Sequence, residues 1–323
     1  AGTSPIDINN YNNSVYTIST SGSYRFTGTG TETSNRIVID NVTSGEVKIY
    51  LNNVNINTGD GPALQITSTV TAQVCIYLEG QNILKTTLHS SAALQKDNNS
   101  GLTITSTNTV TGSLAAQASC GAGIGSGQHI GGASISGNTV SNITISNCSI
   151  EASSITGAGI GSGHHMGGAS ASISGNTVSN ITISNCSVTT SSTKGAGIGS
   201  GMFSVGGASS ISGNTVSNIT ISGGSVKATK IDCTPKDSKN NDVYLCEISN
   251  AASSEITIDA VKRNGPYNHS SIDPSDTTLY AWLTGTDHVV TVGNDSRKYS
   301  FDSANYSFTR SKVAPTASQF TFT

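Results

Sequence analysis

Two histidines, His129 and His165, stand at matching places in a repeat with His164 beside the second, and imidazoles that recur in this way suggest ligand or metal binding. Each of three copies of the segment GAGIGSG is followed closely by a ring-bearing residue. The copies and these residues are 121–127 with His129, 157–163 with His164 and His165, and 195–201 with Phe203. Imidazoles stacked in successive loops could bind a transition metal. We favour the simpler interpretation, a ladder of loop side chains that face water, and expect no metal site and no cofactor.

Carboxylates that could carry out catalysis are scarce in the middle of the chain. Between Asp97 and Lys227 the only Asp, Glu, Lys or Arg side chains are Glu151 and Lys194. A glycosidase needs a pair of carboxyl groups, and the middle of the chain does not supply them. We therefore predict no catalytic residue and lean towards a protein without enzymatic activity. A polysaccharide-active lyase or glycoside hydrolase stays open as the alternative, if the earlier part of the chain presents a carboxylate or lysine cluster on one face.

Two of the six cysteines flank a polar segment near the end of the repeats. Cys233 and Cys246 are separated by 234–245. A disulfide between them would contribute roughly 3 kcal/mol by loop closure, and we predict one. No cysteine pair has CxxC spacing, which argues against metal binding through thiolates.

A second pair of cysteines occupies one position in successive repeats. Cys148 and Cys186 each stand two residues before an inward apolar residue, so both are expected to face the core. Neighbouring strands lie about 4.8 Å apart, which permits either a disulfide or a stacked pair of thiols. We favour the thiol stack. Cys75 and Cys120 are interpreted as buried free thiols.

The repeat also predicts the elements that carry these side chains. SISGNTVSNITIS occurs at 134–146, 172–184 and 210–222. Its Ile-Thr-Ile ending alternates apolar and polar residues, and alternate side chains of a strand face opposite sides of a sheet. Each buried isoleucine stabilises by roughly 1.5–3 kcal/mol, and repeated strands bury such a face against their neighbours. We predict an all-β fold, a single-stranded parallel β-helix, and a right-handed one because parallel crossovers almost always are.

The repeat ends define the expected organisation of the chain. We expect N-terminal capping strands in 1–35, a parallel β-helix in 36–230 with long repeats at 121–156, 157–194 and 195–230, a last coil and small C-terminal β cap in 231–311, and a linker to a further domain in 312–323. The part of each long repeat that is too long for a tight corner is expected to protrude as a loop from one edge. These loops are 128–142, 164–180 and 202–218.

Composition limits the partners of such a molecule. The 323 residues carry a net charge of −3, which favours neither nucleic acid nor an anionic membrane surface as a partner. No run of 18 apolar residues is present, so we predict no membrane insertion. Charged residues make up 11% of the chain, and the surface is expected to be rich in Ser, Thr and Asn. This composition favours an extracellular protein, secreted or attached to a cell surface.

Four motifs carry a resemblance to a known group of proteins. SGSYRFTGTG, strands of the LTITST type, GAGIGSG and NITIS occur in that order along 20–230. Together they resemble large surface proteins of Gram-positive anaerobes, known as carbohydrate-binding-domain-containing proteins with Gly-rich β-helix repeats. The tail 314–323 is similar to the lead-in to Ig-like repeats in such proteins. The resemblance implies a β-helix that belongs to a larger exported protein and binds carbohydrate.

We therefore expect a non-enzymatic extracellular surface module that acts in adhesion or glycan binding. A polysaccharide or other glycan is the expected partner, and repetition of weak contacts gives avidity for a repeating polymer. The expected contact residues are His129, His164, His165, Asn138, Asn176, Asn214 and Phe203. Ice binding is a more distant alternative. It is suggested by the outward threonine column Thr103, Thr144, Thr182 and Thr220.

Overall fold

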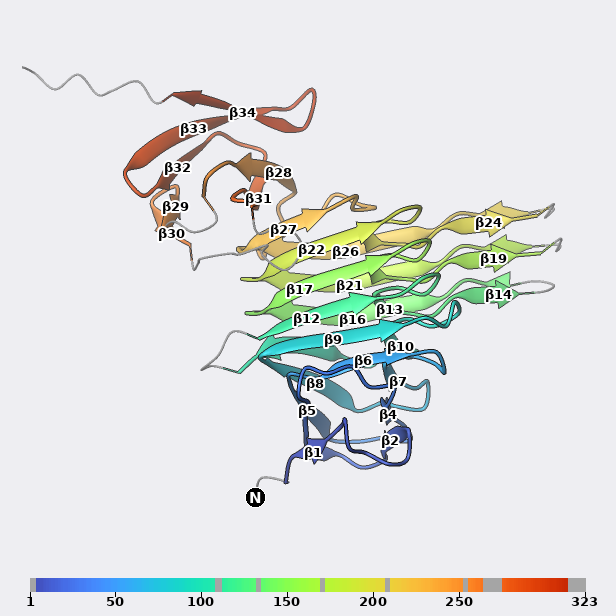
Figure 1. The fold of residues 1–323 in the computed structure, drawn as a ribbon. Helices are drawn as coiled ribbons and strands as arrows, with labels where there is room; N and C mark the ends of the chain where they lie inside the picture. Colours follow the sequence, from blue (N-terminus) through green and yellow to red (C-terminus); the bar gives the residue numbers. More distant parts are fainter. Residues whose placement is uncertain are drawn as a thin grey trace, which may run out of the picture.

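The computed structural model describes residues 4–107, 112–131, 135–168, 172–206, 210–251, 255–263 and 275–312. In these ranges every regular element is a β-strand, and most strands belong to long parallel sheets (Figure 1). The predicted all-β class is thus confirmed. Parts of the three expected loops, and the expected linker beyond Lys312, lie outside the described residues.

Three parallel sheets contain most of the strands. The largest contains, in spatial order, β1 (Ile6–Asp7), β3 (Gly22–Thr27), β5 (Glu46–Asn52), β8 (Gln73–Glu79), β11 (Leu102–Ser106), β16 (Thr139–Ser146), β21 (Thr177–Ser184) and β26 (Thr215–Ser222). The second contains β2 (Val15–Ile18), β4 (Arg36–Ile39), β7 (Leu64–Ile66), β10 (Leu94–Lys96), β13 (Ile124–Gly125), β18 (Ile160–Gly161) and β23 (Ile198–Gly199). The third contains β6 (Asn55–Thr58), β9 (Gln81–Thr86), β12 (Ser113–Gln117), β17 (Ser149–Ser154), β22 (Ser187–Ser192) and β27 (Ser225–Ala228).

The chain visits these sheets in a fixed rotation. From β5 it passes to β6 in the third sheet, to β7 in the second and back to β8, which pairs in parallel with β5. The same rotation leads from β16 through β17 and β18 to β21. Each turn of the chain adds one layer, so the arrangement is solenoid-like (Figure 1). The strands β1, β2 and β3, in the region expected to act as a cap, already belong to these sheets.

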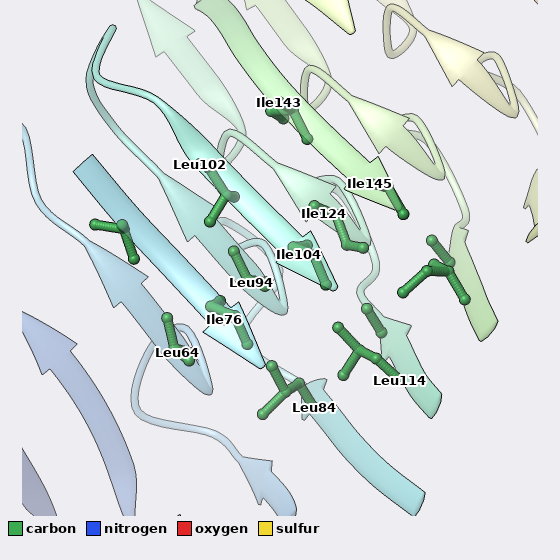
Figure 2. Packing of buried hydrophobic residues seen from close by; sticks show 14 of the residues in the cluster. Leu64, Ile76, Leu84, Leu94, Leu102, Ile104, Leu114, Ile124, Ile143 and Ile145 are labelled. Atoms are coloured by element: carbon green, nitrogen blue, oxygen red, sulfur yellow. The ribbon is translucent and has the colours of Figure 1, made fainter. Parts of the chain in front are cut away.

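Columns of apolar residues in register fill the interior. Leu102, Ile143, Ile181 and Ile219 occupy one such column, and each is at most 1% exposed. The alternate residue Thr144 faces away from this interior and is half-buried. Figure 2 shows side chains from the three sheets converging on the same core. The inward and outward assignments made from the Ile-Thr-Ile pattern are correct.

One inward position holds a charged residue that the pattern did not reveal. Lys96 pairs with Ile66 in the register of β10 and β7, and its side chain is fully buried. Its ammonium donates to the carbonyl oxygen of Asn98 at 2.6 Å. Burial lowers the pKa of Lys96 from 10.5 to about 8, with the nearby Asp97 acting in the opposite direction. The aliphatic stem of Lys96 occupies the position in its layer that Ile66 occupies in the neighbouring layer. An apolar position of the column can therefore hold a lysine.

The repeated asparagines and glycines have structural roles at the corners. Asn142, Asn180 and Asn218 all have φ between 54° and 59°, a conformation that asparagine tolerates. Their amides form a ladder, in which Asn180 donates to Asn142 at 3.1 Å and Asn218 donates to Asn180 at 3.2 Å. At Gly125 a Cβ would lie 1.7 Å from the carbonyl oxygen of Gly161 in the next layer. The GAGIGSG motif therefore permits close stacking of successive layers.

The segments expected to be loops form paired strands where the structure describes them. β14 (His129–Gly131), β19 (His165–Gly167) and β24 (Phe203–Val205) make one short parallel sheet. β15 (Ile135–Ser136), β20 (Ile173–Ser174) and β25 (Ile211–Ser212) make another. We call residues 128–131 and 135–142, with their counterparts 164–168, 172–180, 202–206 and 210–218, the extension. The loop prediction was wrong because each copy finds backbone partners in the copies beside it.

The chain after the last layer changes to antiparallel pairing. β28 (Val243–Ile248) pairs with β31 (Leu279–Thr284), and a second sheet is ordered β30 (Val261–Lys262), β29 (Ile256–Ile258), β32 (His288–Val292), β33 (Asp295–Asp302) and β34 (Ser307–Lys312). We call residues 243–312 the cap. The two sheets share a separate apolar core. Trp282 joins the cap to the last layer, because its indole Nε1 donates to the carbonyl oxygen of Val226 at 2.9 Å.

All six cysteines are free thiols, so the predicted disulfide is absent. Cys233 packs against the core of the parallel layers, whereas Cys246 is fully buried in the cap core. The two cysteines therefore lie in different cores. The polar segment between them in the sequence gave no indication of this separation. Cys148 and Cys186 are buried and in contact, as the thiol-stack interpretation predicted. The contact with Cys186, together with burial, raises the pKa of the Cys148 thiol.

Candidate functional site

The extension brings the predicted ring-bearing residues into one column. His129, His165 and Phe203 are Cα partners in β14, β19 and β24. The rings of His129 and His165 stack with centroids 5.0 Å apart and planes 17° apart. Phe203 meets His165 edge-on, with centroids 5.3 Å apart. The predicted ladder exists, and the third copy continues it with an apolar ring.

This ladder does not face water as expected. His165 is fully buried, and neither of its ring nitrogens has a hydrogen-bond partner in the part of the chain that the structure describes. Burial lowers its pKa, and the neighbouring His129 and His164 add to the effect. His164 is 7% exposed, and its Nε2 lies 3.1 Å from the Ser204 hydroxyl. Pairing within the extension turns these imidazoles inward, so a direct ligand contact is open only to the half-buried His129.

The predicted asparagines close the base of the extension. The side-chain amide of Asn138 donates to the carbonyl oxygen of Gly127 at 2.8 Å. Asn176 is fully buried, and its Oδ1 accepts the backbone N–H of Asn138 at 3.0 Å. Asn214 repeats this role by accepting the N–H of Asn176 at 2.8 Å. These amides are occupied by backbone groups, which explains their recurrence without a ligand.

A different set of side chains is presented to solvent by all three copies. These columns, all exposed, are Ser136 with Ser174 and Ser212, Thr139 with Thr177 and Thr215, and Asn142 with Asn180 and Asn218. Successive strands of a sheet are about 4.8 Å apart, so the columns form a regular grid of hydroxyl and amide groups. We call this set the polar grid. The sequence signal for the polar grid was the identical recurrence of these residues in three copies, whereas the Ile-Thr-Ile alternation does not extend to positions spaced three apart.

The early layers carry a charged outer face, the feature that would favour an enzyme. On β3 and β8, Arg25 binds Glu79, with a second contact between Nη2 and Oε1 at 3.1 Å. On β5, Lys48 pairs with Glu46 at 3.1 Å. A hydrogen bond from the Cys75 thiol, and then the one from Lys48, lowers the pKa of Glu46. A general acid needs a raised pKa, so Glu46 is poorly suited to donate a proton to a leaving group.

An aromatic cleft lies where the cap meets the last layer. Its volume is about 530 Å³, and it lies between segments 233–235 and 242–245. Ring surface is supplied by Tyr244, Trp282 and Tyr306. We call this the junction cleft. Ligand sites commonly have volumes of about 300–1,000 Å³ and combine aromatic walls with a few polar groups, and the junction cleft has both properties.

Where the structure is described, no group of three or more His, Cys, Asp or Glu residues could hold a metal ion. No helix long and apolar enough to cross a membrane occurs in that part of the chain. The threonine column Thr103, Thr144, Thr182 and Thr220 is in register but half-buried, which does not favour the ice-binding alternative.

The chain matches no family model, no curated protein and no solved structure. Its class therefore follows from its own geometry. It is an all-β protein of long parallel sheets with an antiparallel unit at one end.

Proposed function

We propose that this chain is a non-enzymatic extracellular module that acts in adhesion or glycan binding. We further propose that its layers form a single-stranded, right-handed parallel β-helix within a larger exported protein. The rotation of the chain through three parallel sheets supports the helix, and the general preference for right-handed parallel crossovers supports its hand. The Gly-rich repeats that resemble surface proteins support the location.

The observation that carries the proposed function is the polar grid. A polymer of sugars presents hydroxyl groups at regular intervals, and the grid presents exposed serine and threonine hydroxyls in three successive layers, beside an asparagine column whose amides bond to one another. Each contact is exposed to water and therefore weak, but several contacts along one polymer add through avidity. The layers are held by in-register backbone pairing, so little ordering entropy is lost on binding.

The paired charges of the early layers favour binding over catalysis. Arg25 with Glu79, and Lys48 with Glu46, satisfy one another on the outer face of the largest sheet. This arrangement holds charges in place and leaves the Glu46 carboxyl deprotonated at neutral pH. Mutual pairing of these charges supports the non-enzymatic proposal.

The polar grid can be tested by removing one column of hydroxyls. A variant with Thr139→Val, Thr177→Val and Thr215→Val keeps the shape and strand preference of each residue but removes its hydrogen bonds. Binding of the intact chain to glycans on an array should weaken at least tenfold. The matched control is Thr144→Val, Thr182→Val and Thr220→Val on the same three strands, which should bind as the parent does. Equal loss in both variants would refute the grid as the binding surface.

Catalysis is tested on the same samples. The chain is incubated with neutral and acidic polysaccharides, and reducing ends and unsaturated sugars are measured. We expect neither product. Turnover that disappears in a Glu46→Gln or Glu79→Gln variant would replace the proposed function by the polysaccharide-active alternative.

A further inference from the structure

The walls of the junction cleft are aromatic, and its ring surfaces are fixed in place. Trp282 packs against the core of the parallel layers, and its only N–H is used by the carbonyl oxygen of Val226. It therefore offers the cleft a ring surface without a free donor. Tyr244 stacks with Tyr306, with centroids 5.5 Å and planes 20° apart, and contacts Phe301 with centroids 4.8 Å apart. The last layer and both sheets of the cap thus hold the lining in position.

Tyr306 combines a largely exposed side chain with an unfavourable backbone conformation in the turn between β33 and β34. Its side chain is 64% exposed, so it buries little surface on folding. Its φ is 50°, in the left-handed region that is unfavourable for a bulky residue. Glycine or asparagine would adopt this turn more easily. Strained residues that gain little burial are concentrated at binding sites, where the strain holds a side chain in position for a ligand.

The polar groups of the cleft favour a ligand without net charge. The carboxylate of Asp242 is paired with the ammonium of Lys236 at 2.8 Å, so the pair adds no net charge beside the cleft. Thr234 supplies an exposed hydroxyl, and the tyrosines supply phenol groups that both donate and accept. Ring faces flanked by hydroxyl groups match a molecule with an apolar face and a polar rim.

We propose that the junction cleft binds one or two rings of a neutral sugar, with a ring face lying on the exposed ring of Tyr306. This inference rests on the proposed function and assigns to it a second site, distinct from the polar grid. The polar grid would bind many units of a polymer, each weakly, whereas the junction cleft would bind one or two sugar rings between fixed walls. Preformed walls lower the ordering entropy of binding, so the cleft is the stronger of the two sites for a free disaccharide.

The chain contains one tryptophan, so the emission of Trp282 reports on the cleft directly. The protein is titrated with maltose, cellobiose and N,N′-diacetylchitobiose, and fluorescence is followed alongside calorimetry. At least one of these sugars should change the emission saturably. Tyr306→Gly should weaken that binding at least tenfold while keeping or raising the melting temperature, because glycine relieves the positive φ. The control Tyr77→Ala breaks the other stacked tyrosine pair, Tyr50 with Tyr77, and should bind as the parent does.

The outcomes separate this inference from the proposed function. Calorimetric binding without a change in Trp282 emission, and unchanged in Tyr306→Gly, would refute the cleft and leave glycan binding intact. No binding of any of the three sugars would also refute the cleft, and the glycan array then decides the proposed function by itself. Binding of tetramethylammonium, lost in Asp242→Asn, would show a site for organic cations and contradict a neutral ligand.

Discussion

In the parallel layers, the equivalent position of successive repeats supplies a whole column of the core. In the cap, by contrast, each buried residue has its own partners. Ile143, Ile181 and Ile219 are interchangeable members of a column. Cys246 and Tyr299 are buried in the cap among residues that occur once. The comparison shows two ways to bury apolar surface. Repetition makes the layers predictable and uniform, and irregularity gives the cap the distinct side chains that form a cleft.

The largest expected effect comes from a charge placed in each core. Ile181→Asp buries a carboxylate with no partner in the middle of the stack and should prevent folding of the central layers. Ile258→Asp should disrupt the cap, because Ile258 is part of the cap core. The parallel layers should stay folded, because each layer is stabilised mainly by the layers next to it. Circular dichroism reports the layers, and Trp282 emission reports the junction with the cap. Unchanged melting of Ile181→Asp would disprove the inward assignment, and Thr182→Ala, the control, should change stability by less than about 0.5 kcal/mol.

Replacing the buried lysine by an apolar residue should stabilise the column that contains it. Lys96→Met keeps the volume of the side chain and removes the buried charge, so stability at neutral pH should rise by about 1–4 kcal/mol. The lowered pKa means that the folded protein loses this proton more readily than the unfolded chain. The contribution of Lys96 to the free energy of unfolding of the parent protein should therefore rise as pH increases from about 8 towards 10.5. The variant should lack that rise. Denaturant unfolding at several pH values measures both effects, and a destabilised Lys96→Met would show that the ammonium is needed.

One carboxylate adds to the joint that Trp282 makes between the two regions. Asp276 accepts the Lys227 ammonium at 2.7 Å and the Tyr280 hydroxyl at 2.9 Å. Burial opposes ionisation, but the bond from Lys227 and the Thr278 N–H hold the pKa of Asp276 well below its usual value. This stability is present above a pH of about 4 and is lost as pH falls further. Asp276→Asn should lower the melting temperature of the cap, at a cost of about 1.5–3 kcal/mol, with Glu247→Gln at an exposed position of β28 as the control. An unchanged cap transition would contradict this joint.

The smallest effect is expected when His165, in the second copy of the extension, is replaced by the phenylalanine that the third copy has at the matching position. His165→Phe should stabilise the extension by about 1 kcal/mol, because it removes two buried nitrogens without partners. Burial, with His129 and His164 adding to it, lowers the pKa of His165, so the unfolded chain binds the proton better. Parent stability should consequently fall as pH drops below about 6.5, and the variant should lose less. Hydrogen exchange of the β19 amides at pH 5 and pH 8 measures this, and equal pH dependence in both proteins would refute it.

Much of the layered fold was readable from the sequence, and the sites were not. Alternation in Ile-Thr-Ile depends only on strand geometry, so it gave the inward faces correctly. The disulfide between Cys233 and Cys246 failed because closeness in sequence says nothing about which of two cores a residue joins. The histidine column was found by repeat spacing, but its inward direction depends on pairing between copies. The sequence around Tyr306 gave no indication that this residue lines a cleft.

The sequence by itself determined the strand type, the repeating layers, the positions that need asparagine or glycine, and the poverty of charge in the middle of the chain. These properties follow from local conformational preference and from a period that any layer must share with the next. Only the tertiary structure decided that the protruding segments pair, that Lys96 takes a core position, and that Tyr244, Trp282 and Tyr306 line one cleft. These outcomes depend on contacts between segments far apart in the chain, and no local pattern encodes such contacts.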